Sequence, residues 1–187
     1  MDNVEKAKQM FLSYSCSYYS MTREGVMEEY RALGVSPSME RTWAMELGFN
    51  LLRHFSDVLV DDTELSFMFR LISDYKLFSL LEAFNYSLER NIDALDTFTK
   101  ILVGEDLMRV ESRLRPTGGT DFAILIATRT NIENIVRRIG DERITISAYY
   151  RKVGYFNEML DDKSIQDRIR VLREQVILKS WGKQRDG

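Results

Sequence analysis

The sequence predicts an all-α protein, a compact bundle of eight or nine helices. Pro37 and Pro116 are the only prolines among 187 residues, and proline interrupts a helix interior because it lacks an N–H group and clashes with the preceding turn. Apolar residues recur at spacings of three and four along most of the chain, as on the buried face of a helix. Hydrophobic residues make up 44% and charged residues 29% of the chain, which is typical of a folded globular protein.

The first part of the chain indicates two helices before Pro37. Residues 2–19 carry apolar side chains at helical spacing and are predicted to form one continuous helix. Ser20 or Thr22 is expected to cap a second helix. Gly34 is expected to end it, because glycine readily adopts the left-handed conformation that follows a helix.

Pro37 is expected to begin a helix rather than to break one. Ser36 can cap that helix, and the first helical position tolerates proline. Further helices are predicted to begin near residues 61–64, Leu77 and Ile92, where caps or apolar repeats at helical spacing occur.

Residues 116–119, Pro-Thr-Gly-Gly, are the clearest interruption in the chain. We interpret them as a hinge or break between an acidic helical region, residues 1–115, and an Arg-rich helical region, residues 120–181, which pack together as one domain overall. Gly104 is expected to kink or end the helix that precedes them. Residues 182–187 form a polar tail that is expected to fray.

Two segments beyond this break leave helix and strand open. Residues 122–128 and 144–148 are rich in β-branched side chains and are possible short strands, although a helix is the preferred interpretation. The remaining apolar pattern predicts a helix that ends at Gly140 and later helices around Tyr149 and Ile165.

Charge is distributed unevenly along the chain. Residues 1–110 hold 11 Lys and Arg against 18 Asp and Glu, whereas residues 111–187 hold 15 against 11, and eleven of those cations are Arg. Regions of opposite sign can attract one another or present two different surfaces to partners.

The sequence carries no sign of a membrane or secretory protein. Its longest nearly apolar run, Phe122–Ala127, is far too short to cross a bilayer, and the N-terminus has no basic and apolar leader pattern. The single cysteine, Cys16, fits a reducing compartment. We therefore expect a cytoplasmic protein.

Few residues offer catalytic chemistry. One His and one Cys cannot build a usual zinc site, so we expect no metal and no cofactor, and we interpret Cys16 as a buried thiol. His54, Asp57 and Asp61 stand at i, i+3 and i+7, which leaves open a carboxylate, metal- or nucleotide-dependent enzyme. The preferred interpretation of His54 is a core residue, because it follows the apolar stripe of its helix.

Residues 13–21 have the most unusual local composition, with three Tyr and four Ser. Tyrosine beside arginine is typical of residues that anchor protein interfaces. The binding residues predicted here are Tyr18, Tyr19, Arg23 and Glu24.

The last third of the chain supplies a second set of candidate binding residues, Arg113, Arg115, Arg137 and Arg138. Together with Arg129 and Arg143 they could line a groove for phosphate, so nucleic-acid binding is an alternative function. Acidic neighbours dilute this cluster, and the chain as a whole is acidic.

The start of the chain resembles small uncharacterised bacterial cytosolic proteins. The residues that carry the resemblance are Phe11–Ser15, Tyr19–Gly25, Glu29–Tyr30, Glu40 and Trp43. The resemblance implies a bacterial cytosolic protein and no particular activity.

These observations favour a non-enzymatic protein that binds another protein, as an adaptor, a regulator or a neutralising protein. The two alternatives are an enzyme built around His54 and nucleic-acid binding through the Arg-rich last third. No membrane partner is expected, and the oligomeric state is left open.

Overall fold

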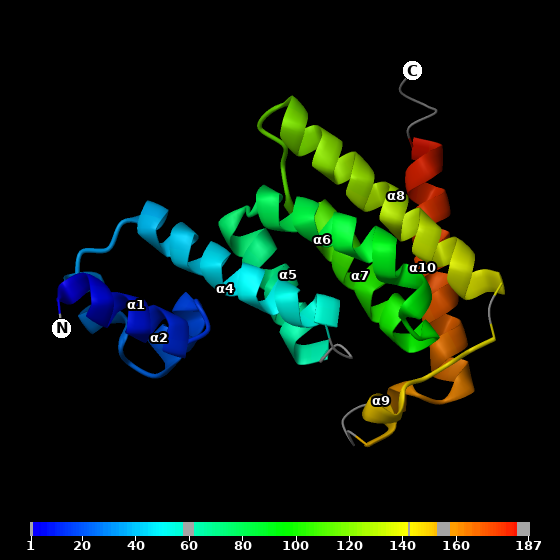
Figure 1. Ribbon diagram of the computed structural model, residues 1–187, viewed down its shortest axis with the longest axis horizontal. Coiled ribbons are helices and arrows are strands. Elements are labelled where there is room, and N and C mark those ends of the chain that lie inside the picture. The colour runs from blue at the N-terminus through cyan, green and yellow to red at the C-terminus, as the bar shows by residue number, and fades with distance from the viewer. Residues whose placement is uncertain (1, 58–61, 142, 153–157, 183–187) are drawn as a thin grey trace.

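The computed structural model describes residues 2–57, 62–141, 143–152 and 158–182 (Figure 1). Within these ranges the chain forms ten α-helices and the short 3-10 helix η1, which confirms the predicted all-α fold. In chain order they are α1 (Asn3–Ser13), α2 (Tyr18–Arg23), α3 (Met27–Ala32), α4 (Pro37–Asp57), α5 (Asp62–Tyr75), α6 (Phe78–Asn91), η1 (Ile92–Ala94), α7 (Thr97–Arg113), α8 (Gly119–Asp141), α9 (Ala148–Lys152) and α10 (Asp162–Gly182).

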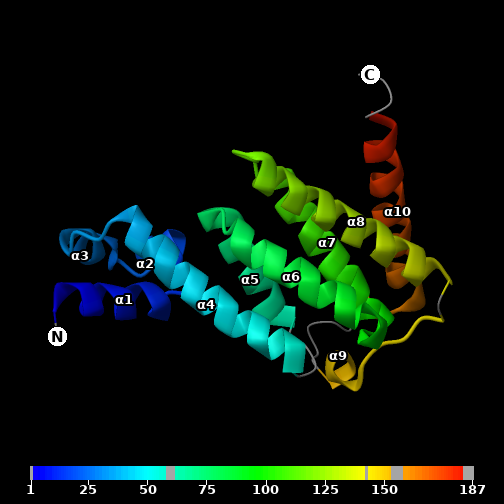
Figure 2. The ribbon, with the colours of Figure 1, turned by 45° about the horizontal axis from the view of Figure 1, so that its top comes forward.

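Helices α4 to α8 form two layers. Figure 2 shows α4, α6 and α8 side by side, with α5 and α7 behind them. Helix α7 lies at the centre, where it packs against α5, α8 and α10, and most of its side chains are buried. The outer surfaces of α4, α6 and α8 therefore make up one broad face of the molecule.

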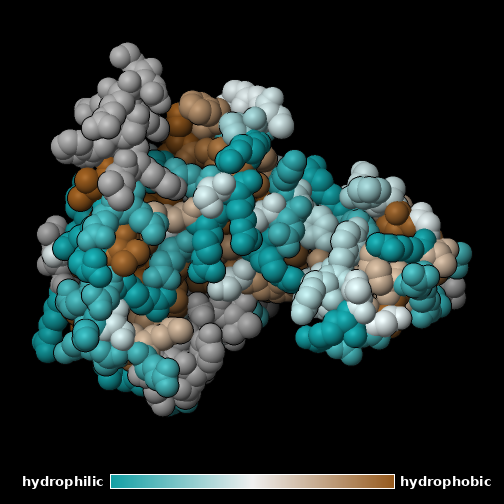
Figure 3. Space-filling model, turned by 180° about the vertical axis from the view of Figure 1, so that it is seen from behind, coloured by the Kyte–Doolittle hydropathy of each residue, from teal (hydrophilic) through white to brown (hydrophobic). Residues whose placement is uncertain are grey.

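Helices α1 to α3 form a separate unit on the first half of α4 (Figure 1). Seen from behind, this unit stands apart across a narrow waist, and apolar residues on the rest of that surface show as small separate patches (Figure 3). The centre of the unit is Phe11, which is fully buried and whose ring centroid lies 5.9 Å from those of Tyr30, Trp43 and Tyr75. Aromatic packing therefore joins this unit to α4 and α5.

The single helix predicted over residues 2–19 is wrong, because the chain turns sharply after Ser13. Ser15 and Cys16 adopt left-handed backbone angles, with φ of 53° and 55°, a conformation that costs energy in residues other than glycine. The Ser17 side chain then caps α2 by accepting a hydrogen bond from the Ser20 backbone N–H. The left-handed pair thus separates α1 from α2.

The predicted helix from Ser20 or Thr22 to Gly34 is also divided, because Gly25 has a φ of 75° between α2 and α3. Gly34 itself has the expected left-handed angle, with φ of 70°. The prediction for Pro37 is confirmed: it is the first residue of α4, and the Ser36 hydroxyl accepts a hydrogen bond from the Met39 N–H at 3.3 Å.

Gly104 was predicted to kink or end its helix; it does not end it, since α7 continues through it to Arg113. A Cβ atom at Gly104 would lie 3.3 Å from Ile135 Cγ2 on α8 and 3.7 Å from the Leu172 methyl groups on α10. The glycine therefore allows three helices to approach closely, and it marks a packing contact instead of a break.

Residues 114–118 connect α7 to α8, so the predicted interruption at 116–119 is found, and its role as a hinge stays a prediction. Residues 122–128 lie inside α8, whereas 143–147 form neither helix nor strand. In this segment the Thr145 N–H donates to Thr97 Oγ1 at 2.9 Å, and the Thr97 N–H donates to Thr145 Oγ1 at 3.1 Å, at the start of α7. Side-chain pairing with α7 replaces the ladder that a strand would need.

The ends of the Arg-rich region depart partly from expectation. Helix α8 ends at Asp141, one residue after Gly140, and α9 covers only Ala148–Lys152. The tail beyond Gly182 lies outside the described residues.

Candidate interaction surfaces

The residues predicted for binding near the N-terminus lie on α2 and at its C-terminal end. The Tyr19 side chain is 76% exposed, as expected for an interaction residue. The Arg23 guanidinium is paired with the Glu24 carboxylate at 2.8 Å. Tyr18 is 44% exposed, but its hydroxyl donates a hydrogen bond inward to Glu40. Tyr19 is therefore the member of this group that presents most of its side chain to solvent.

A buried carboxylate lies beneath Tyr18. Glu40 on α4 is only 5% exposed and accepts hydrogen bonds from the hydroxyls of Tyr18 and Tyr30, the latter at 2.6 Å. Burial, and then the hydrogen bond to Glu40, raises the pKa of both tyrosines above the ordinary range. The hydroxyls stay protonated and keep donating, so Glu40 ties α2 and α3 to α4.

Cys16 lies beside this cluster, and its pKa predicts an unreactive thiol. Burial raises the pKa of Cys16 from 9.0 to about 12, and only the thiolate is an effective nucleophile. We expect iodoacetamide to label Cys16 near pH 8 far more slowly in the folded protein than in urea, as measured by mass spectrometry. Equal rates in both states would contradict this prediction.

The same raised pKa sets a direction for stability at alkaline pH. Below about pH 9 the thiol is protonated in both states, so the stability linked to Cys16 is fully present there. As pH rises toward 12 the unfolded chain loses the proton first, so the free energy of unfolding falls. Urea unfolding across this range, with Cys16→Ala as the reference, measures the effect.

The predicted arginines of the last third occupy other parts of the molecule. Arg113 ends α7 and Arg115 lies in the following connection, where it donates to backbone carbonyls. Arg137 donates to Asn134 Oδ1 at 2.9 Å, and Arg138 pairs with Asp93. Figures 1 and 2 place α2 at one end of the molecule and the C-terminal part of α8 at the other. The structure therefore does not bring the eight predicted binding residues together.

Three of the other described arginines of this region are paired with carboxylates. The pairs are Arg129 with Glu111 and Glu133, Arg168 with Glu105, and Arg170 with Asp167 and Glu174. Paired cations attract phosphate less strongly than unpaired ones. This pairing favours a structural role for much of the arginine-rich composition.

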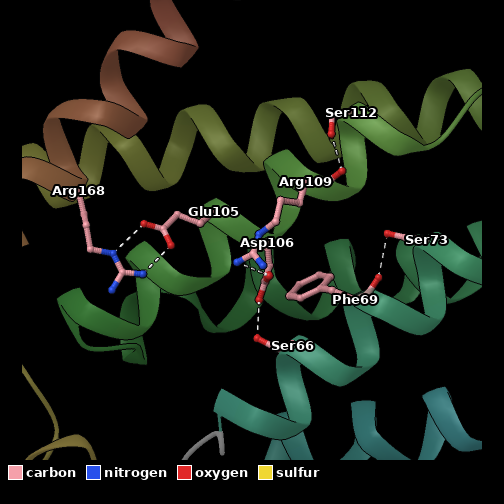
Figure 4. Close-up of polar contacts among 8 residues, drawn as sticks. All are labelled: Ser66, Phe69, Ser73, Glu105, Asp106, Arg109, Ser112 and Arg168. Carbon is pink, nitrogen blue, oxygen red and sulfur yellow. Dashed lines mark hydrogen bonds and ion pairs between the residues drawn. The ribbon is translucent and has the colours of Figure 1, made fainter. Parts of the chain in front are cut away.

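Two carboxylates on α7, which the sequence did not single out, have fixed partners on different helices (Figure 4). Glu105 accepts two hydrogen bonds from the Arg168 guanidinium of α10, at 2.8 and 2.5 Å. Asp106 is 4% exposed, lies 2.8 Å from Arg109 and accepts a hydrogen bond from Ser66 of α5 at 3.1 Å. Adjacent positions on a helix point in different directions, so the two carboxylates hold α10 and α5 and do not converge.

The histidine and carboxylate hypothesis stays a hypothesis. His54 and Asp57 belong to α4, but their side chains, like Asp61, lie outside the described residues. Among the residues that are described, no three His, Cys, Asp or Glu side chains gather as a metal site would require.

On the broad face of α4, α6 and α8, here called the α4–α6–α8 face, two of the exposed aromatic residues border one groove. Phe49 on α4 is 36% exposed and Tyr86 on α6 is 62% exposed. A groove of about 490 Å³ runs between them, with Leu52 and Ala83 in its lining and the cations Arg53 and Arg90 beside them. Phe49 and Arg53 also line a hollow of about 610 Å³ along α4.

A second groove, of about 460 Å³, lies on the other side of Tyr86, between α6 and α8. Its charged residues are Glu82 and Glu89, so its sign is opposite to that of the first groove. The Arg90 guanidinium lies 5.5 Å from the Tyr86 ring centroid and donates to its hydroxyl at 3.0 Å. Tyr86 thus separates a basic groove from an acidic one.

The sequence carries a signal for this face, in the position of two aromatic residues relative to the apolar stripes. The apolar stripe of α4 includes Leu47 and Leu51, and that of α6 includes Phe84 and Leu88. Phe49 and Tyr86 fall off these stripes. An aromatic residue outside the buried stripe of an amphipathic helix is a candidate for an exposed contact.

No protein-family model matches the sequence, and no curated protein or solved structure shows significant similarity to it. The described helices include none that is both long and apolar enough to span a bilayer. What the fold defines is therefore the class of all-α helical bundles.

Proposed function

We propose that this protein is a non-enzymatic protein-binding module, an adaptor, regulator or neutralising protein, and that the α4–α6–α8 face is its docking surface. The observation that carries the proposal is the pair of exposed aromatic residues, Phe49 and Tyr86, which border one groove together with Arg53 and Arg90. Aromatic residues and arginine are the side chains most enriched in the energetic centres of protein interfaces.

The chemistry of the groove indicates the kind of partner. The groove lies between α4 and α6. A groove between two helices suits an amphipathic helix that inserts its apolar side chains. Arg53 and Arg90 favour carboxylates on that helix by charge complementarity. The proposed partner is therefore an α-helical segment with an apolar residue that packs between Phe49 and Tyr86 and acidic residues that face the arginines. A bacterial cytosolic location belongs to the proposal, and the unpaired, buried Cys16 supports a reducing compartment.

Affinity capture from the native cell with matched variants tests the docking surface. We expect one stoichiometric partner on the wild-type protein, and we expect Tyr86→Ala or Arg53→Glu to weaken its binding by about 30-fold, because loss of a central interface residue costs about 2 kcal/mol. Tyr19→Ala is the matched control, since it removes an exposed tyrosine from α2. Binding of the recovered partner to each purified variant is then measured by calorimetry.

Two results would contradict the proposal. Loss of the partner with Tyr19→Ala and its retention with Tyr86→Ala would move the docking surface to α2. Absence of any stoichiometric partner, together with a small molecule that raises the melting temperature, would reject a protein-binding function.

A further inference from the structure

A chain of buried side-chain hydrogen bonds leads into the groove between α6 and α8. The Thr128 hydroxyl donates to the Ile124 carbonyl at 2.9 Å. The oxygen of that hydroxyl accepts a hydrogen bond from Asn85 Nδ2 at 2.8 Å. Asn131 Nδ2 in turn donates to Asn85 Oδ1 and to the Asn85 backbone carbonyl, both at 3.2 Å.

The donor and acceptor at each step of this series of hydrogen bonds are fixed by the groups that take part. The Thr128 proton is used on the Ile124 carbonyl, so its oxygen requires a donor, and Asn85 must turn its Nδ2 toward it. A backbone carbonyl only accepts, so Asn131 must likewise turn its Nδ2 toward Asn85. Asn131 Oδ1 is therefore the last atom in this series of hydrogen bonds, and it is an acceptor.

This terminal acceptor belongs to the groove. Asn131 is only 6% exposed and lines the groove, and within the described part of the chain no donor hydrogen-bonds to its Oδ1. This oxygen is not fully enclosed, so it is open to the groove and can accept a hydrogen bond from a ligand that donates. The charged lining residues, Glu82 and Glu89, are acceptors as well, while Ala123 and Ala127 add apolar lining.

We propose that this groove binds an arginine side chain of the partner protein, an inference that rests on the proposed docking surface. A guanidinium supplies five donors in one plane, enough for Asn131 Oδ1 and the two carboxylates. The methylene stem packs on the apolar lining, and the Tyr86 ring forms an aromatic wall for the planar group. The partner segment thus presents carboxylates to the basic groove and arginine to the acidic one.

One internal contact shows that the wall of the groove accepts a guanidinium. Asn134 also lines this groove, and its Oδ1 already accepts a hydrogen bond from Arg137 at 2.9 Å. Arg137 therefore satisfies Asn134 Oδ1, whereas Asn131 Oδ1 can accept a hydrogen bond from an external donor. Lysine fits less well, because its ammonium is a compact, strongly hydrated charge that cannot lie flat against the tyrosine ring.

Titration with small probes, followed by nuclear magnetic resonance of the ¹⁵N-labelled protein, tests the inference without the partner. The probes are the N-acetyl methylamides of arginine, of lysine and of citrulline, which matches arginine in shape but has no charge, and free spermidine. We expect the arginine probe to shift the side-chain amide signals of Asn85 and Asn131 at lower concentration than any other probe. In Glu82→Gln/Glu89→Gln its affinity is expected to fall by at least about threefold.

Glu28→Gln/Glu158→Gln is the control, because it removes the same net charge from exposed positions elsewhere. It is expected to leave the affinity unchanged. An equal response to citrulline, equal losses in both double variants, or stronger binding of lysine or spermidine would overturn the inference. Because the titration needs no partner, its failure leaves the capture experiment standing, and failure of the capture experiment does not alter the titration.

Discussion

Replacing Glu40 with alanine is expected to lower the free energy of unfolding by about 2–4 kcal/mol. A buried hydrogen bond to a charged group contributes about 1.5–3 kcal/mol, as for Tyr30, and the bond from Tyr18, which is 44% exposed, contributes less. The substitution removes the acceptor of both Tyr18 and Tyr30. Tyr30 is only 3% exposed, so its hydroxyl would be left buried without its partner. Urea denaturation followed by far-ultraviolet circular dichroism measures the change.

Glu46→Ala is the matched control on the same helix. Glu46 is exposed and pairs with Lys8 at 2.7 Å on the protein surface. Exposed pairs contribute about 0–1 kcal/mol. If Glu40→Ala cost no more than Glu46→Ala, the buried carboxylate would not be what ties the N-terminal unit to α4.

Gly48→Ala is expected to destabilise the protein by about 1–3 kcal/mol, the usual cost of overpacking a close contact. A Cβ atom at Gly48 would lie within 2.3 Å of a methyl group of Leu80. Leu80 is fully buried, so it cannot turn aside into solvent. Relief requires the Leu80 side chain to change rotamer inside the packed core or α4 and α6 to move apart, and thermal unfolding measures the cost.

Gly119→Ala makes the same chemical change where nothing lies within 4 Å of the new Cβ. The free energy of unfolding of Gly119→Ala is expected to stay within about 0.5 kcal/mol of the wild-type value or to rise slightly. Equal effects of the two substitutions would refute the close approach of α4 and α6. Because Gly48 sets that spacing, Gly48→Ala is also expected to reshape the groove beside Phe49 and weaken partner binding.

The all-α fold could be predicted because helical periodicity is a local property of the sequence. The start of α4 at Pro37 could be predicted for the same reason, since cap and proline chemistry act within one turn. The break at Ser15 and Cys16 could not, because neither residue favours a left-handed angle by itself. Gly104 misled for the opposite reason: its local preference for a break is overruled by close packing of α8 and α10.

The candidate site was predictable only in part. Local composition indicated Tyr19 as a binding residue, and the structure shows that its side chain is exposed. It could not reveal that α2 and the C-terminal part of α8 lie at opposite ends of the molecule. The grooves on the α4–α6–α8 face combine residues from separate helices, so they arise only when those helices pack.

The strained turn between α1 and α2 has a consequence for folding while the chain is being synthesised. Its two carbonyls are held from α5: Arg70 donates to the Ser15 carbonyl at 2.6 Å and the Tyr75 hydroxyl to the Cys16 carbonyl at 2.7 Å, over 55 and 59 residues of chain. A chain emerging from the ribosome completes its first three helices before either donor exists. Phe11 can pack against Tyr30 and Trp43 once α3 and α4 are made, but its contact with Tyr75 has to wait until α5 follows. Helices α1 to α3 are thus made before the donors that hold this turn, and the nascent chain is open to chaperones and proteases during that interval.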